Sequence, residues 1–302
     1  MSVTVHAPSS TANLGPGFDV FGLALDAFYD KITLSEAKVS SIKSNDSIPL
    51  DLEKNTAGLV IQYMKEKFEI SNHVEIEIEK GVPAGYGMGS SAASAAATAV
   101  AFDKLFNLKL DSNKLIECAG VGEQASAGTI HYDNVAASVL GGFVIVQNTT
   151  PLKTIMIEPP KDLRLCIVIP KIDTPEKKTQ VSRDVIPNNV KFADSIENLA
   201  KATSMVAGFA KKDCKLIGDS VKDIIVEPAR KHMIPGFDAS KKNAMKAGAL
   251  GFTISGAGPA VIAFATEADD LEGISSAIKN GMASVGTSHD IICKPSIGAR
   301  IQ

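Results

Sequence analysis

A glycine-rich segment that leads directly into an alanine-rich run most constrains how this chain can fold. The segment reads PAGYGMGSSAA over residues 83–93, and the alanines continue beyond it in a run that favours a helix. Gly85, Gly87 and Gly89 lack a Cβ atom, so the backbone can adopt positive φ angles and direct several N–H groups at one anion. The helix adds unpaired N–H groups and the positive end of its dipole. The segment therefore predicts a phosphate-binding loop.

The predicted loop contains no lysine, which excludes the commonest types of nucleotide-binding loop. A Walker loop requires GxxxxGK[ST], and protein kinases combine their glycine loop with HRD and DFG motifs; none of these motifs occurs in the sequence. Lys80, just before the loop, is predicted to be a solvated turn residue, with neutralisation of phosphate charge as the alternative. A nucleotide-binding design of another kind is therefore expected.

Chain length and net charge limit the number of domains and the kinds of partner that the protein can have. A chain of 302 residues predicts about two domains. The formal net charge of -3, with lysines scattered among acids, offers no basic surface to nucleic acid. No leader-like N-terminus and no apolar run near the roughly 18 residues of a membrane span occur. We expect a cytoplasmic protein without nucleic-acid or membrane partners, whose four widely spaced cysteines are free, buried thiols.

Hydrophobic periodicity predicts the order of helices and strands. In the first half we expect strands at 3–7, 32–34, 73–79 and 141–146, an irregular stretch at 8–22, and helices at 55–68, 90–106 and 112–127. In the second half we expect strands at 163–169, 252–255, 260–265 and 290–294, with helices at 179–186, 192–209, 215–225 and 269–282. The pattern changes near residues 150–162, where we place a domain boundary.

Two further glycine motifs flank the loop in a fixed order. The first reads APSSTANLGPGFDVFGLAL at residues 7–25, and the last reads TISGAGPAVIAF at residues 253–264. Together the three motifs resemble the GHMP kinase superfamily. Within it, the segments GEQASAGTIHYDNVAASVLGGF, TQVSRDVIP and VEPAR resemble the homoserine kinases of archaeal type. The similarity spans essentially the whole chain, and Met88 replaces the leucine usual in the family, a change that conserves volume.

The resemblance implies an α+β fold of two domains. Residues 1–155 are expected to form an N-terminal ATP-binding domain, an α/β domain like ribosomal protein S5. Residues 156–302 are expected to form a C-terminal domain of ferredoxin-like α+β type. The central loop and its surroundings would then bind ATP, through Asn55, Pro83, Ala84, Gly85, Tyr86, Gly87, Met88, Gly89, Ser90 and Ser91.

The resemblance also implies a magnesium ion at this loop. Mg²⁺ prefers oxygen ligands and usually takes only one or two from the protein when it bridges nucleotide phosphates. Ser91 and Glu123 are the expected ligands. The alternatives from the residues alone are a solvated helix face for Glu123 and helix caps for Ser90 and Asn55.

The acceptor implied by the resemblance is L-homoserine, a small zwitterion with a primary alcohol. Arg183 and Arg230 are expected to bind its carboxylate, because a planar guanidinium does so in a bidentate manner. A surface position is the alternative for each arginine. Asp19, with Asn13 beside it, is expected to face the ammonium group, or else to form a turn. His131, Thr179 and Gly256 complete the expected substrate site.

Catalysis is assigned to Asn134 and Arg183. In several GHMP kinases an aspartate acts as a base in this region, but the aligned position here is Asn134, and an amide is no base at neutral pH. We expect Asn134 to orient the acceptor hydroxyl, because phosphoryl transfer mainly requires alignment and charge neutralisation. Asp133 is not assigned the role of general base.

The expected activity is therefore ATP-dependent phosphorylation of L-homoserine to O-phospho-L-homoserine, a step toward threonine. Two alternatives stay open: a GHMP kinase that accepts mevalonate or shikimate, and a non-catalytic nucleotide-binding regulator on the same fold. Apolar surface in the C-terminal half is compatible with a homodimer.

Overall fold

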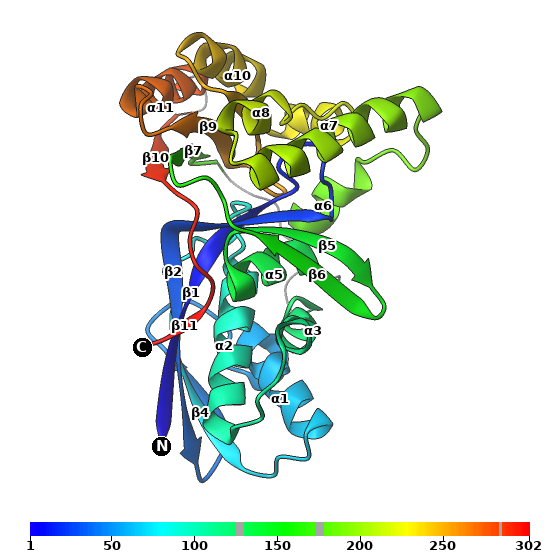
Figure 1. Ribbon diagram of the computed structural model, residues 1–302. Helices are drawn as coiled ribbons and strands as arrows, with labels where there is room; N and C mark the ends of the chain where they lie inside the picture. Colours follow the sequence, from blue (N-terminus) through cyan, green and yellow to red (C-terminus); the bar gives the residue numbers. More distant parts are fainter. Residues whose placement is uncertain (125–129, 173–177, 284–285) are drawn as a thin grey trace.

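The N-terminal half of the molecule is a twisted sheet covered by helices. The computed structural model describes residues 1–124, 130–172, 178–283 and 286–302 (Figure 1). Strands β1 (Ser2–Ala12) and β2 (Phe21–Ala37) form a long antiparallel pair in which Val5 lies opposite Ile32. The sheet continues through β4 (His73–Glu79) to β3 (Ser41–Ser44), while β5 (Phe143–Thr149) pairs with the other part of β2 and with β6 (Leu152–Ile157).

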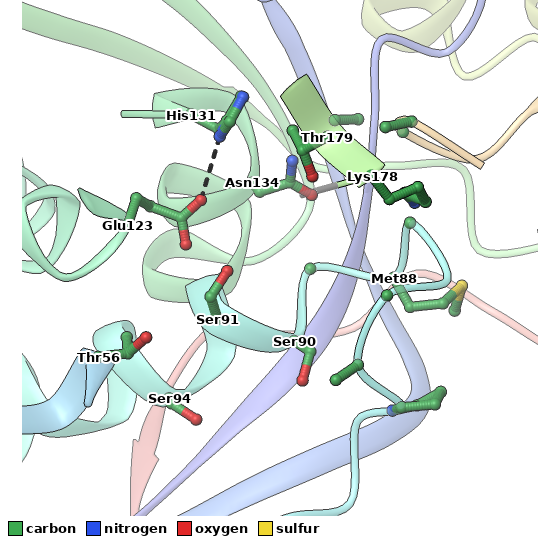
Figure 2. Close-up of a pocket in the computed structure, with 18 of the residues that line it drawn as sticks. Thr56, Met88, Ser90, Ser91, Ser94, Glu123, His131, Asn134, Lys178 and Thr179 are labelled. Carbon is green, nitrogen blue, oxygen red and sulfur yellow. Dashed lines mark hydrogen bonds and ion pairs between the residues drawn. The ribbon is translucent and has the colours of Figure 1, made fainter. Parts of the chain in front are cut away.

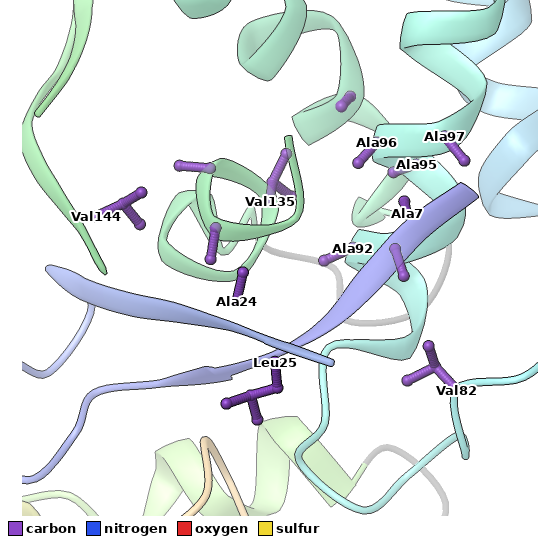
Figure 3. Packing of buried hydrophobic residues seen from close by; sticks show 14 of the residues in the cluster. Ala7, Ala24, Leu25, Val82, Ala92, Ala95, Ala96, Ala97, Val135 and Val144 are labelled. Atoms are coloured by element: carbon purple, nitrogen blue, oxygen red, sulfur yellow. The ribbon is translucent and has the colours of Figure 1, made fainter. Parts of the chain in front are cut away.

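The alanine-rich run forms α2 (Ser90–Phe106), the central helix of this half. Its small side chains, Ala92, Ala95 and Ala96 among them, are fully buried and allow it to lie close to β1 (Figure 3). Around α2 lie the short helix η1 (Leu52–Lys54), α1 (Thr56–Lys67), α3 (Ser112–Gly122) and α5 (Tyr132–Leu140). The close approach of α2 places its N-terminus, and the loop before it, beside the sheet.

The C-terminal half contains a four-stranded antiparallel sheet in the order β10 (Ser288–Cys293), β7 (Leu163–Pro170), β9 (Val261–Thr266), β8 (Gly251–Ile254). Helices α10 (Phe237–Lys246) and α11 (Leu271–Gly281) pack on one face. The remaining helices are α6 (Lys178–Asp184), α7 (Phe192–Lys211), α8 (Cys214–Asp219), α9 (Val226–Arg230) and η2 (Lys231–Met233).

The buried side chains of β7 alternate between two hydrophobic clusters, as the two-residue period of a strand requires. Leu165 and Ile167 belong to the large cluster that includes the N-terminal core, whereas Cys166 and Val168 belong to a smaller cluster under α10 and α11. The rings of Phe143 on β5 and Phe209 on α7 stack with centroids 3.9 Å apart. One continuous core therefore joins the two halves.

The end of the chain returns to the N-terminal sheet. After β10, Pro295 bridges to Leu25 and Ile297 bridges to Gly141. Strand β11 (Arg300–Ile301) then pairs with β1. The chain thus passes between the halves twice, once after β6 and once after β10.

Several predicted elements are confirmed, and others are wrong or missed. The helix at 90–106 and the strand at 73–79 have the predicted bounds, and the C-terminal strands differ by a few residues. The stretch at 8–22 is not irregular throughout, because β1 continues to Ala12 past a register shift at Pro8 and β2 begins at Phe21. Helices α5 and α10 and strands β3 and β6 were not predicted. The helix beginning at Ser112 ends at Gly122, and its predicted end at 127 lies outside the described residues.

Other predictions from the sequence are confirmed by the structure. Asp111 caps α3 by accepting a hydrogen bond from the Lys114 N–H. The cysteines are buried free thiols. Across the described ranges, no helix has the length and apolar character needed to span a bilayer.

Candidate active site

A pocket of about 470 Å³ is lined by residues from both halves of the chain. It gathers nearly all of the predicted site residues: Asn13, Asp19, Asn55, Pro83, Ala84, Gly85, Gly87, Met88, Gly89, Ser90, Ser91, Glu123, His131, Asn134, Thr179, Arg183, Arg230 and Gly256. Tyr86 is the exception, because its half-buried side chain packs against the large core. The structure therefore brings the nucleotide and acceptor residues of the sequence analysis into one cavity.

The phosphate loop has the backbone conformation that its glycines predict. The φ angles of Gly85, Gly87 and Gly89 are 84°, 80° and 68°. Gly89 is the N-cap residue of α2 and makes no side-chain cap. The N–H groups of the first helical turn are therefore not occupied by a capping side chain, which is the arrangement that suits an anion.

Backbone hydrogen bonds hold the three glycine motifs together. The Ser10 N–H donates to the Met88 carbonyl oxygen over 3.0 Å, which joins the first motif to the loop. The Ala260 N–H donates to the Tyr86 carbonyl over 3.2 Å, and the Gly256 N–H donates to Ala12 over 3.3 Å. The third motif thus packs on both of the others.

Gly87 of the loop lies close against Ser255 and Gly258 of the third motif. A Cβ atom on Gly87 would clash with the Ser255 carbonyl oxygen and lie 3.0 Å from that of Gly258. The third motif is also a tight turn, because the Gly258 N–H donates to the Ser255 carbonyl over 2.8 Å. The third motif therefore both turns the chain and packs against the loop.

Lys80 anchors the start of the loop, so the prediction of a solvated turn residue is wrong. Its ammonium group pairs with Asp30, whose side chain is fully buried, and donates to the Ser94 hydroxyl over 2.9 Å. The same carboxylate accepts hydrogen bonds from the backbone N–H groups of Gly81 and Val82, each over 3.0 Å. A buried charge is tolerated when it is paired and fully hydrogen-bonded, and this network meets that condition.

Two further side chains have structural partners. The Ser90 hydroxyl donates to the Val82 carbonyl over 2.8 Å, so its interpretation as a helix cap is wrong. Asn55 is the N-cap residue of α1, where its side chain accepts from the Ala57 N–H over 2.9 Å and donates to the Pro49 carbonyl over 2.7 Å. Both residues nevertheless line the pocket.

Ser91 and Glu123 form a hard oxygen donor set beside the loop. Figure 2 shows the Ser91 hydroxyl at the start of α2 turned toward the Glu123 carboxylate at the end of α3. Glu123 is buried, so the alternative of a solvated helix face is wrong. No group of three or more His, Cys, Asp or Glu side chains placed to hold a metal occurs among the described residues. The pair therefore fits an ion that takes most of its oxygens from phosphate and water.

His131 lies between this pair and the acceptor side. Its Nδ1 is 3.3 Å from Glu123 Oε2. Burial lowers the pKa of the imidazole, but the hydrogen bond and charge of Glu123 outweigh burial and raise the pKa above its usual value. The histidine is thus a direct neighbour of the candidate metal ligand.

On the acceptor side, Arg183 and Asp19 form a bidentate ion pair. Arg183 Nη1 and Nη2 donate to the two Asp19 oxygens, each over 2.9 Å. The hydrogen bond to Asp19 raises the pKa of Arg183. Both side chains are partly exposed, so the pair is weak enough to exchange for a zwitterionic ligand with the same two charges.

Arg230 is buried, so the alternative of a surface arginine is wrong for this residue. Its Nε donates to the Ser182 carbonyl over 2.8 Å, and Nη1 donates to the Gly256 carbonyl over 3.3 Å. Burial and the nearby Arg183 lower its pKa to about 10. The ring of Phe18 contacts both guanidinium groups, with its centroid 5.2 Å from Arg183 Cζ and 5.1 Å from Arg230 Cζ.

Asn134 lies on α5 at the centre of the pocket lining. Its Oδ1 accepts a hydrogen bond from the Ser10 hydroxyl over 3.0 Å. The neighbouring Asp133 is buried, and its Oδ1 accepts from the Asn134 backbone N–H over 2.8 Å. Burial raises the pKa of Asp133 to about 6.

The sequence analysis missed four residues that matter for this site. Asp30 anchors the loop, Ser10 holds Asn134, Phe18 contacts both arginines, and Lys178 lines the acceptor side. Ser10 and Phe18 lie within the first motif, so the motif itself was the available signal. Asp30 and Lys178 lie outside every motif, and only the tertiary structure identifies them.

Comparison with known proteins is consistent with this geometry. The family models for the GHMP kinases N terminal domain and the GHMP kinases C terminal domain match residues 55–142 and 205–284. The chain belongs to the GHMP kinase family. GHMP kinases use ATP as their substrate, which accounts for the loop and the motifs that support it.

Individual relatives of this GHMP kinase cover almost its whole length. A homoserine kinase from Methanopyrus kandleri is 42% identical over 93% of this chain and 92% of its own. A homoserine kinase from Thermoplasma acidophilum is 38% identical over 92% of this chain and 89% of its own. The crystal structure of homoserine kinase from Cytophaga hutchinsonii superimposes with a TM-score of 0.92 at 35% identity, covering 100% of this chain and 97% of that one.

Proposed function

We propose that this GHMP kinase transfers the γ-phosphoryl group of ATP to the side-chain hydroxyl of L-homoserine, giving O-phospho-L-homoserine. The observation that carries the proposal is the set of homoserine kinases at 38% and 42% identity over about nine tenths of both chains. The acceptor side of the pocket supports it, because Arg183, Arg230 and Asp19 present the two signs of charge that a zwitterion requires.

In the proposed reaction the loop holds the donor. The N–H groups of the loop and of the first turn of α2 bind the phosphates of ATP, with Gly87 and Gly89 providing the close backbone approach. Ser91 and Glu123 are the residues that would hold Mg²⁺, which neutralises phosphate charge when bound. Asn55 and Thr56, at the start of α1, line the part of the pocket available to the nucleoside.

The acceptor replaces the ion pair between Arg183 and Asp19. We place the homoserine carboxylate against Arg183 and Arg230, and its ammonium group against Asp19 and the Asn13 side. Thr179 lies four residues before Arg183 on α6 and supports the same ligand, together with Gly256 and His131.

Transfer then depends on alignment. Asn134 orients the acceptor hydroxyl, whose oxygen forms the new bond to phosphorus as the bond from phosphorus to the leaving oxygen of ADP breaks. The hydroxyl proton leaves late, to an oxygen of the transferred phosphoryl group, because a loose transition state places little demand on an early base. Arg183 stabilises the charge on that group. Asp133 is directed at the Asn134 N–H and is given no proton-transfer role.

A coupled ADP-release assay with homoserine, mevalonate and shikimate tests the proposed substrate. We expect turnover with homoserine well above the blank without acceptor, and none with the other two. Mass spectrometry should identify O-phosphohomoserine. Turnover with mevalonate or shikimate alone would reassign the substrate, and no turnover with any acceptor, despite ATP binding, would favour a nucleotide-binding regulator.

We also propose that the chain forms a homodimer. Exposed apolar side chains at helical spacing on α7, namely Phe192, Ile196 and Leu199, support this proposal. Light scattering after size exclusion should give twice the mass of one chain, and Leu199→Asp should reduce it to a monomer. A monomeric wild type would contradict the proposal.

A further inference from the structure

Lys178 is a cation in the active-site pocket to which no role is yet assigned. It is the first residue of α6, is half-buried and lines the pocket together with Thr179 and Arg230. Its amine donates a hydrogen bond to the Gly258 carbonyl oxygen. Figure 2 shows the side chain beside Thr179 on the acceptor side, reaching toward the loop that carries Met88.

The amine lies beside the phosphate loop. Gly258, whose carbonyl it contacts, is the residue that packs on Gly87, where a Cβ atom would come within 3.0 Å of the same carbonyl oxygen. One carbonyl group therefore separates the Lys178 amine from the backbone of the loop. A lysine amine has three donors when charged, so two remain after the bond to Gly258.

Among the residues that the structure describes, the charged groups around Lys178 are cations or carboxylates engaged elsewhere. Arg230 on α9 repels it, and Arg183 on α6 is paired with Asp19. Within the described part of the chain no carboxylate forms an ion pair with Lys178, and Asp133 on α5 is directed at a backbone N–H. Burial, with Arg230 second, lowers the pKa of the amine to about 7. A half-buried cation in this position is stabilised only when an anion arrives.

The other two lysines in the described lining of the pocket are already engaged. Lys54 pairs with Asp51 over 3.4 Å. Lys80 is held by Asp30 and Ser94. The loop itself contains no lysine. A triphosphate on the loop would therefore present its terminal group to Lys178 from the opposite wall of the pocket.

We infer that Lys178 binds the γ-phosphoryl group of ATP directly, from the acceptor side of the pocket, and supplies the cation that the loop lacks. The inference depends on the proposed function only in taking ATP as the donor. Binding of the anion favours the ammonium form, so the enzyme takes up a proton when ATP binds near or above pH 7. The inferred contact is with the γ-phosphoryl group and not with the α- or β-phosphate, which ADP shares with ATP.

The test compares nucleotides with and without a third phosphate. Dissociation constants of ATPγS and ADP, each with Mg²⁺ and without acceptor, are measured by calorimetry at pH 6.5 and 8.5. The proteins are the wild type, Lys178→Met, Lys178→Arg and the exposed control Lys191→Met. We expect Lys178→Met to weaken ATPγS binding at pH 6.5 by about tenfold or more and ADP binding by less than about twofold.

The pH dependence separates a charge contact from a structural one. Wild-type affinity for ATPγS should fall by about tenfold between pH 6.5 and 8.5, because the free amine loses its proton near pH 7. Lys178→Arg should bind ATPγS with little pH dependence, since a guanidinium stays charged. This comparison also cancels the ionisation of the ligand and of His131, which are the same in both proteins.

Three results would overturn the inference. Equal weakening of ATPγS and ADP by Lys178→Met would mean that the lysine only positions the loop. If Lys178→Met weakened homoserine binding and left ATPγS binding unchanged, the lysine would be assigned to the acceptor carboxylate. An unchanged pH dependence in Lys178→Arg would exclude the charge contact even if Lys178→Met failed to fold. Failure of the proposed function is a separate outcome, namely ATPγS binding as expected without homoserine turnover.

Discussion

At the scale of single residues, Asn134 shows how the site positions a group that has no acid or base chemistry of its own. The Ser10 hydroxyl fixes the Oδ1 atom of the amide, and the NH₂ group donates one hydrogen to Asp133 Oδ1 over 3.4 Å, which leaves its second hydrogen for a ligand. The orientation of the amide is thus set by a residue from the first glycine motif. Positioning by a fixed amide is what a loose phosphoryl transfer requires.

We expect Asn134→Ala to lower kcat for homoserine by about 100-fold and to leave the KM for ATP within about twofold, because alignment is lost and nucleotide contacts are not. Steady-state kinetics measure both. Ser10→Ala should cause a smaller loss of kcat. A rise in KM alone would contradict the positioning role, and so would a sharp rise in turnover with a new pH dependence in Asn134→Asp.

Asp133 illustrates the energetic cost of a buried carboxylate next to the site. Its pKa is raised from an ordinary 3.8 to about 6 because burial disfavours the charged form. A carboxylate with a raised folded-state pKa contributes stability that is present below about pH 4 and is lost as the pH rises through about 6.

We therefore expect Asp133→Asn to raise the free energy of unfolding at pH 7.5 by about 2 kcal/mol, since each tenfold change in proton affinity corresponds to about 1.4 kcal/mol. The variant should also lose part of the decline in stability between pH 4 and 6. Urea denaturation at several pH values measures both effects. A variant less stable than the wild type at pH 7.5 would show that the carboxylate is a net stabiliser.

At the scale of elements, the phosphate loop is held at both ends before any ligand binds. Asp30 fixes its start through Gly81 and Val82, and the third motif packs on Gly87. Positive φ angles were predictable from the glycines alone. The partner that closes on Gly87 lies about 170 residues away in the sequence and could be anticipated only through the family resemblance.

We expect Gly87→Ala to raise the KM for ATP by about tenfold or more, because a Cβ atom there combines a positive φ with a clash against the third motif. Gly248→Ala is the matched control: its φ is +101° but no heavy atom lies within 4 Å of the added Cβ. The control should lose about 1 kcal/mol of stability and keep its KM. Equal effects on KM would mean that backbone strain, and not close packing, is responsible.

Local signals explain which elements the sequence predicted. Helix α2 and strand β4 follow uninterrupted patterns, and their bounds are as expected. Helix α10 was missed because its buried face consists of Phe237, Ser240 and Ala244, which give little contrast with the exposed face.

At the scale of the whole molecule, the two halves share a core. The predicted division at residues 155 and 156 stays a prediction, but the large cluster includes Leu165 and Phe209 from the C-terminal half. The stacked rings of Phe143 and Phe209 lie within it. The sequence could not reveal this continuity, because strand periodicity identifies two buried faces without naming what covers each.

We expect the protein to unfold in one cooperative transition, and Phe209→Ala to lower the free energy of unfolding by about 3 to 5 kcal/mol without creating a second transition. Met245→Ala, at a side chain that is 45% exposed, should change it by less than about 1 kcal/mol. Calorimetry and denaturant titration give both values. Two resolved transitions would mean that the halves are independent.

The return of the chain to the first sheet also restricts how the pocket can open. Because one covalent link leaves after β6 and another comes back through Pro295 and Ile297 to β11, the C-terminal half is tethered at two points rather than one. A domain joined by a single connection can rotate in any direction, whereas two connections define one axis of rotation. Any rotation of the C-terminal half relative to the first sheet is therefore restricted to that axis, and the stacked rings of Phe143 and Phe209 in the shared core restrict it further.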